Sequence, residues 1–177
     1  MKHSFQEKLE FSLGARQTFD LELLKNNIVG CVSVVKTDAE ADRAGIDYVA
    51  TLRQGAQILI DAKARAAGAS RYWKYGEPEL ALEVWSICPT AGKPGKVGWT
   101  LSESSNADMI LFTFEDAKVF YLLPFQPLRM AFQKNYSSWL RTYGSRKERS
   151  TRWTSEAVFV PASVVMDEIR RQMRGMS

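Results

Sequence analysis

The chain has 177 residues, with 24 Lys and Arg against 20 Asp and Glu, a net charge of +4, and a single His. With 45% hydrophobic and 25% charged residues, the composition is that of a globular domain and excludes a disordered or fibrous chain. His3 lies near the start of the sequence, which leaves almost no candidate base for a His-dependent triad or a zinc hydrolase. An enzyme with this composition would use carboxylates, Lys, Tyr or a hard metal ion.

Cysteine content and hydropathy indicate a soluble protein. Cys31 and Cys88 each lie within an apolar run, which predicts small buried thiols in a reducing compartment. The longest apolar stretches, Ile28–Val35 and Met109–Phe114, are far shorter than the roughly 20 residues of a membrane-spanning helix. Charges run through Met1–Leu13, which lacks the apolar centre of a signal peptide. We therefore expect a cytoplasmic protein with no membrane partner.

In chain order, the predicted elements mix helices and strands within a single domain. Apolar residues at steps of three and four predict helices over residues 4–14, 19–27, 127–140 and 163–173. Runs of branched and aromatic residues predict strands over 28–35, 46–52, 57–63, 80–88, 109–114, 118–123 and 157–160. The connections 37–43, 89–98 and the basic stretch 143–152 are predicted as loops or single turns. This order indicates one α/β domain over residues 1–177.

The predicted hairpin over residues 45–63 carries the residues with the most chemical meaning. Side chains alternate between the two faces of a strand, so Asp61 and Lys63 share a face, opposite the apolar face of Ile60 and Ala62. Hairpin pairing can bring Asp47, on the partner strand, beside Asp61. Two adjacent carboxylates repel each other, and a hard divalent cation suits such a pair. That ion would polarise a phosphoryl oxygen, and a nearby Lys can orient the attacking water.

This pattern resembles a known family. Gly45-Ile46-Asp47-Tyr48 followed by Ile58-Leu59-Ile60-Asp61-Ala62-Lys63 is similar to the core motif of the PD-(D/E)XK nuclease superfamily, an acidic residue on one strand and acidic-x-Lys on the next. The resemblance implies a restriction-endonuclease-like fold, with an open mixed central β-sheet flanked by helices. It places the core over about residues 1–125 and a basic, aromatic helical extension over about 126–177. It also implies that Asp47 and Asp61 bind Mg²⁺ or Mn²⁺ and that Lys63 serves the hydrolytic water.

Several features depart from that pattern or leave it open. Ile46 stands where the pattern has Pro, and the helix expected after the Asp-x-Lys strand is poorly defined between Ala64 and Gly76. Many members add a Glu from the N-terminal helix; of Glu7 and Glu10 we prefer Glu10 as a catalytic residue, and Glu83 is a weaker candidate ligand. An Asp-x-Lys triplet by itself is more often a solvated ion pair, but the apolar run before it favours the nuclease interpretation.

Positive charge collects after residue 128 and in a short segment that follows Lys63. Basic side chains neutralise phosphates, and aromatic rings between them can stack on exposed bases. The candidate nucleic-acid-binding residues are Arg65, Arg71, Lys74, Arg146, Lys147 and Arg149. The alternative for both segments is a solvated surface with buried Trp residues, and the sequence favours neither.

The sequence therefore predicts a small Mg²⁺-dependent endonuclease that hydrolyses phosphodiester bonds of DNA, of a kind that a phage or mobile element carries. A homodimer is expected because cutting both strands of a duplex takes two active sites. One alternative is a nuclease-fold protein that binds nucleic acid without catalysis. Another is a protein-interaction module with no nucleic-acid partner, which salt-sensitive DNA binding would count against.

Overall fold

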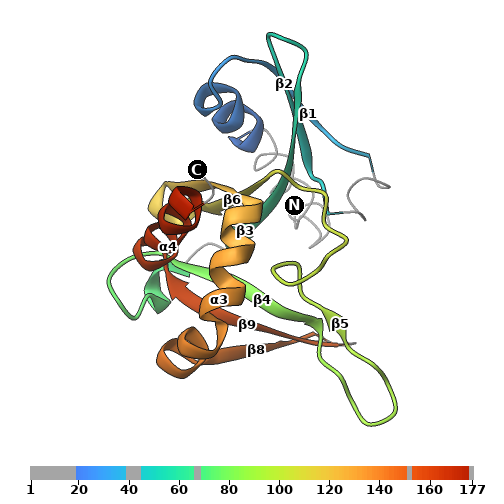
Figure 1. Ribbon diagram of the computed structural model, residues 1–177, viewed down its shortest axis with the longest axis vertical. Helices are drawn as coiled ribbons and strands as arrows, with labels where there is room; N and C mark the ends of the chain where they lie inside the picture. Colours follow the sequence, from blue (N-terminus) through green and yellow to red (C-terminus); the bar gives the residue numbers. More distant parts are fainter. Residues whose placement is uncertain (1–18, 39–44, 66–68, 151–152, 176–177) are drawn as a thin grey trace, which may run out of the picture.

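Two β-sheets and the helices packed on them form the computed structural model, which describes residues 19–38, 45–65, 69–150 and 153–175 (Figure 1). Within these ranges one sheet has five strands in the order β1-β2-β3-β6-β7, and the other has four in the order β5-β4-β9-β8. The strands are β1 Cys31–Lys36, β2 Tyr48–Leu52, β3 Gln57–Arg65, β4 Glu79–Ile87, β5 Lys96–Val97, β6 Met109–Phe114, β7 Val119–Pro124, β8 Ser145–Arg149 and β9 Thr154–Pro161. The helical segments are residues 19–27, η1 Ala69–Tyr72, η2 Glu115–Ala117, α3 Phe125–Tyr143 and α4 Ala162–Gly175.

The five-stranded sheet is mixed. The strands β1, β2 and β3 follow one another antiparallel, β3 pairs parallel with β6, and β7 returns antiparallel to β6. Asp108 holds the parallel pair in register, because its carboxylate accepts the Leu59 N–H at 2.8 Å and its own N–H donates to the Leu59 carbonyl. The predicted α/β class, the mixed sheet and the β2–β3 hairpin are confirmed.

Two hydrophobic clusters cover the two faces of this sheet. The helix over residues 19–27 covers one face, where Leu24 packs with Tyr48, Ile60 and Leu111. The larger cluster joins the other face to the second sheet and to α3 and α4, and includes Phe112 and Leu82. Because this cluster draws residues from both sheets and both C-terminal helices, the described chain is one compact domain.

The prediction of a single central sheet is wrong, because the expected strand over residues 80–88 lies in the second sheet. There β4 pairs with β5 and β9, while β3 pairs directly with β6. The connection from β3 to β6 therefore has to carry β4 out of the first sheet. Alternation along β4 makes this possible, since Leu80, Leu82 and Val84 all enter the larger core cluster.

The basic stretch predicted as a loop forms a strand instead. In the hairpin of β8 and β9, Lys147 stands opposite Glu156 and Arg146 opposite Ala157. Acidic partners hold these basic residues in the strand, since Arg146 and Lys147 lie 2.6 Å from Glu79 and 3.8 Å from Glu156. The part of the chain after residue 125 thus supplies two strands as well as α3 and α4, and it belongs to the shared core.

Smaller differences concern the first strand and the cysteines. The strand predicted from Ile28 begins later, at Cys31, because Gly30 has a positive φ of 75° and closes a turn there. Cys31 and Cys88 are free and half-buried, so full burial was a wrong prediction for both. Among the helices that the structure describes, we find none that is both long and apolar enough to span a membrane.

Candidate active site

The β2–β3 hairpin brings Asp47, Asp61 and Lys63 together. Asp47 directly precedes β2, and its N–H donates to the Ile60 carbonyl at 2.8 Å. Its carboxylate Oδ2 accepts the N–H of Ala62 at 2.6 Å, which holds the side chain against the strand that bears Asp61 and Lys63. One bond from its backbone N–H and one to its side chain therefore fix Asp47 beside β3.

Asp61 is a buried carboxylate that forms an ion pair with Lys63. Its residue is 2% exposed, and the Lys63 Nζ lies 2.7 Å from its Oδ1. Gly45 lies on its other side, where a Cβ would be 3.9 Å from Oδ2, and the φ of Gly45 is +77°. Gly45 thus allows the backbone to take a positive φ close to the carboxylate of Asp61.

The surroundings of Asp61 shift its titration toward neutrality. Burial is the largest cause and raises the pKa of Asp61 to about 7, with the charge and hydrogen bond of Asp47 adding to the rise. The charge and hydrogen bond of Lys63 oppose it. The carboxyl group of Asp61 therefore lies between an acidic neighbour that raises its pKa and a basic neighbour that lowers it.

This donor set suits a hard divalent cation. Mg²⁺ commonly binds through one or two carboxylates and keeps waters or substrate phosphates as its other ligands. A cation beside Asp47 and Asp61 would also offset the burial and repulsion that raise the pKa of Asp61. No group of three or more His, Cys, Asp and Glu forms within the described ranges, so Glu83 does not complete such a set there. Glu7 and Glu10 lie outside the described residues.

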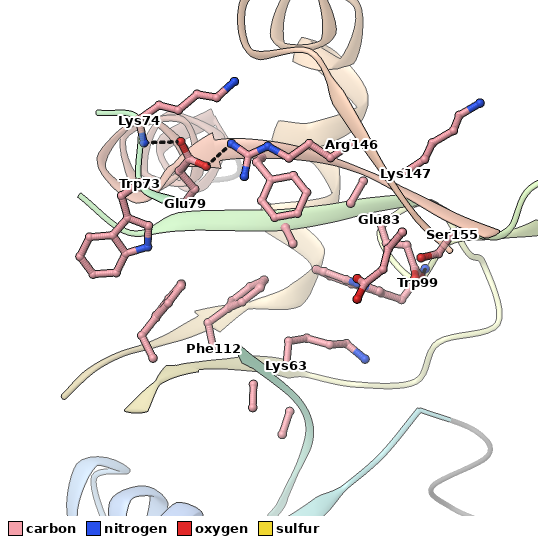
Figure 2. Close-up of a pocket in the computed structure, with 17 residues that line it drawn as sticks. Lys63, Trp73, Lys74, Glu79, Glu83, Trp99, Phe112, Arg146, Lys147 and Ser155 are labelled. Carbon is pink, nitrogen blue, oxygen red and sulfur yellow. Dashed lines mark hydrogen bonds and ion pairs between the residues drawn. The ribbon is translucent and has the colours of Figure 1, made fainter. Parts of the chain in front are cut away.

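A cavity of about 850 Å³ opens between the two sheets next to this trio (Figure 2). Lys63 lies on its wall and extends from β3 into the space below Glu83 and Trp99. The opposite wall is formed by the second sheet, on the face of β4 and its neighbouring strands that bears Glu79. On this wall Arg146 donates a hydrogen bond to Glu79. Lys63 therefore connects the buried carboxylate of Asp61 to a space that is open to a ligand.

Three of the predicted nucleic-acid-binding residues line this cavity: Lys74, Arg146 and Lys147. Arg146 is held in place, since its Nη2 lies 2.6 Å from Glu79 Oε2 and its Cζ lies 4.2 Å from the centre of the Phe159 ring. Arg71 and Arg149 are exposed and are not among the lining residues. Arg65 ends β3, and its side chain lies outside the described part of the chain.

Sequence reasoning missed the aromatic and acidic side of the site. Trp99 reads as a core residue, and it does contact Phe112, yet it also lies on the cavity wall with its ring centre 5.5 Å from Lys63 Nζ. Glu79 lies just before the predicted strand over residues 80–88, and in the structure it begins β4 and is 3% exposed. The alternation over residues 79–84, where Glu, Ala and Glu alternate with Leu, Leu and Val, is the sequence signal that could have revealed this acidic face.

Comparison of the chain with protein-family models, with curated proteins and with solved structures found no match. A pair of carboxylates can hold a metal ion, and an adjacent ammonium can stabilise negative charge or orient a water molecule. A neighbouring cavity with cationic and aromatic walls can hold an anionic, ring-containing ligand.

Proposed function

We propose that this protein is a metal-dependent nuclease of the PD-(D/E)XK kind that hydrolyses phosphodiester bonds in DNA. The proposal depends on one observation: Asp47 lies against the strand that bears the ion-paired Asp61 and Lys63, and Lys63 reaches the wall of a cavity that Arg146 also lines. Carboxylates, a Lys and a hard ion are the catalytic means that a chain with a single His retains.

Each residue of the trio has a role in this proposal. Asp47 and Asp61 would hold Mg²⁺ or Mn²⁺, which when bound polarises a phosphoryl oxygen and lowers the pKa of water. Lys63 reaches the cavity from Asp61, so its ammonium can orient the attacking water and stabilise negative charge that develops on the phosphoryl oxygens. Asp61 keeps that ammonium in place through the 2.7 Å contact.

The arrangement of the first sheet also supports the proposal. A helix over residues 19–27 precedes three antiparallel strands, the motif lies on β2 and β3, and β6 runs parallel to β3. This matches the open mixed sheet that the resemblance implies. The crossover from β3 to β6 differs, since it contributes β4 and β5 to a second sheet and its described part holds the short η1.

One observation favours a second candidate, a nuclease-fold protein that binds nucleic acid without cutting it. Lys63 already neutralises Asp61 at Oδ1, and in the described ranges the two carboxylates have no third acidic partner. Cytoplasmic location and a homodimer remain predictions under either candidate.

Cleavage of supercoiled plasmid and of single-stranded circular DNA in Mg²⁺ tests the proposal. We expect Asp61→Asn, Asp47→Asn and Lys63→Met each to lower the rate by about 10²-fold or more, as the loss of one charge-stabilising group commonly does. Mg²⁺ should raise the melting temperature of the wild type but not that of Asp61→Asn, because a ligand stabilises only the state that binds it.

The matched controls are Asp167→Asn, at an exposed ion pair on α4, and Lys25→Met, on the exposed side of the first described helix. Both should cut like the wild type. Equal cutting by Asp61→Asn and the wild type would refute the site. Salt-sensitive DNA binding with no cleavage in Mg²⁺ or Mn²⁺ would instead establish the second candidate.

A further inference from the structure

We propose that the cavity between the two sheets binds one unpaired nucleotide, so that the substrate is single-stranded nucleic acid or an unpaired end. The inference deepens the proposed function and, for the position of the scissile phosphate, rests on it. The ligand is a nucleobase with its phosphate, and it belongs to a single-stranded nucleic acid.

The size of the cavity agrees with one nucleotide. Its volume of about 850 Å³ lies within the range of small-molecule sites, whereas stacked base pairs with two backbones need far more space. The space exists because small side chains of the second sheet face it: Ala81 from β4 and Ala157 from β9. A base enters such a pocket when it is unpaired, and an unpaired base avoids the free-energy cost of leaving a duplex stack.

The walls offer aromatic surface to a base. Trp73, Trp99 and Phe159 are half-buried and line the cavity, so their rings are within reach of a ligand. Two of these rings are held by other rings: Trp73 lies edge-on to Phe114 at 5.8 Å, and Trp99 is tilted on Phe112 at 6.0 Å. Rings that are already fixed lose little conformational entropy when a base stacks on them.

The charged lining separates into phosphate and base contacts. Lys63 supplies an ammonium group, while Arg146 is paired with Glu79 and Lys147 with Glu156. The two other acidic lining residues are Glu148, which is exposed, and Glu83.

Glu83 is fixed by the Ser86 hydroxyl at 2.6 Å and by the Trp99 N–H at 3.3 Å. A fixed carboxylate next to an aromatic wall accepts hydrogen bonds from the exocyclic amino groups of bases and repels phosphate. The base is therefore expected near Glu83 and Trp99, and the phosphate near Lys63.

Lys63 joins this nucleotide site to the carboxylates. Its ammonium contacts Asp61 and lies 5.5 Å from the centre of the Trp99 ring, so one side chain touches both regions (Figure 2). A nucleotide whose base stacks beside Trp99 has its phosphate within reach of Lys63. Entry of an unpaired nucleotide would thus bring a phosphodiester next to Asp47 and Asp61.

Fluorescence of 2-aminopurine tests the site without any cleavage. An oligodeoxynucleotide carrying one 2-aminopurine is titrated with the protein in EDTA, first as a single strand and then fully paired in a duplex. We expect saturable quenching with the single strand, because the fluorescent base stacks on aromatic rings, and at least tenfold weaker binding of the duplex. Ala157→Phe, which fills the cavity, should weaken binding of the single strand by about tenfold or more.

Two controls and a second variant make the result decisive. Ala56→Phe adds the same ring at an exposed turn, and Trp153→Ala removes an exposed ring that is not a lining residue; both should bind like the wild type. If Ala157→Phe does not fold by circular dichroism, Trp73→Leu replaces it, with the same loss expected.

Equal binding of duplex and single strand, or wild-type binding by a folded Ala157→Phe, would overturn the inference. Free 2-aminopurine deoxynucleoside monophosphate that binds as tightly as the strand would assign the cavity to free nucleotides and overturn it as well. Because the titration contains no divalent metal, quenching that persists in a protein without nuclease activity would refute the proposed function and leave the nucleotide site standing. Cleavage confined to duplex DNA would refute the nucleotide site and leave the proposed function standing.

Discussion

At the scale of single residues, the site is a compromise between charge and burial. Asp61 is almost fully buried, and one Lys and one Asp compete to set its ionisation. A carboxylate in this position costs folding free energy whenever it is ionised, since its desolvation exceeds what Lys63 returns. Such costs are tolerated where function needs the charge, which is why the group is of interest as a metal ligand.

Replacing Asp61 with Asn should therefore stabilise the metal-free protein at neutral and alkaline pH. The pKa of Asp61 is 3.8 in the unfolded reference and about 7 in the fold, so the wild type gains a proton on folding between these values and loses stability as pH rises through them. We expect Asp61→Asn to match the wild type near pH 4 and to exceed it by roughly 2–4 kcal/mol above pH 7. Urea unfolding in EDTA from pH 4 to 9 measures this, and a pH-independent difference would contradict it.

At the scale of elements, acidic residues decide where basic segments lie. Arg146 crosses β9 to reach Glu79 on β4, and it passes over the ring of Phe159 on the intervening strand. This contact attaches the basic strand β8 to the second sheet from the cavity side. Between the two C-terminal helices, Glu168 of α4 accepts hydrogen bonds from Lys134 of α3 at 3.1 Å and from Arg171 of its own helix at 2.8 Å.

The α3–α4 contact should be sensitive to acid. Burial raises the pKa of Glu168, but hydrogen bonds from Arg171, Lys134 and Gln172 outweigh it and lower the value from 4.5 to about 2. A lowered pKa means that the ionised form stabilises the fold above pH 4.5 and that this contribution is lost as pH falls through 2.

We expect Glu168→Gln to cost about 1–2 kcal/mol at pH 7, a value reduced for the exposure of its basic partners. The difference from the wild type should vanish near pH 2 in denaturant titrations. Asp167→Asn is the adjacent control, since both members of its ion pair are more than half exposed, and it should change stability by less than about 0.5 kcal/mol. A Glu168→Gln penalty that persists at pH 2 would show that the contact is packing and not charge.

At the scale of the whole molecule, one hydrophobic core joins the two sheets. Leu82 of β4 is fully buried in the cluster that also holds Phe112 of β6 and residues of α3 and α4. The cavity lies on the other face of β4, so the sheets meet through the core on one side and leave room for a ligand on the other. One face of β4 thus packs in the core that stabilises the domain, and its other face lines the cavity that a ligand can enter.

Truncation of this shared core should weaken the whole domain at once. Leu82→Ala is expected to lower the free energy of unfolding by about 2–5 kcal/mol while keeping one cooperative transition. Hydrogen exchange should show the same decrease in the free energy of unfolding at amides of β2 and of β9, although of these two strands only β9 pairs with the strand that bears the substitution. Val97→Ala on β5, whose side chain is exposed, is the control and should leave both values near those of the wild type. Separate transitions for the two sheets would contradict a single domain.

Local patterns predicted much of the first sheet and the trio. The β2–β3 hairpin, the β6–β7 pair and the two C-terminal helices follow from apolar periodicity and turn residues, which act over a few neighbours. The proximity of Asp47 to Asp61 was predictable for the same reason, because hairpin register is a local property. The strand β8 was not, since Arg146 and Lys147 are held by Glu79 and Glu156, of which Glu79 is 67 residues from Arg146 in the chain.

The sequence by itself determined the α/β class, the residues available for chemistry and the hairpin that brings Asp47, Asp61 and Lys63 together. Only the tertiary structure decided that β4 leaves the first sheet, that Trp99 and Arg146 face Lys63 across a cavity, and that Asp61 is buried enough to raise its pKa to about 7. The physical reason is the distance along the chain over which each effect acts. Periodicity and turns are fixed by neighbouring residues, whereas desolvation and the space between two sheets depend on segments that meet only when the chain has folded.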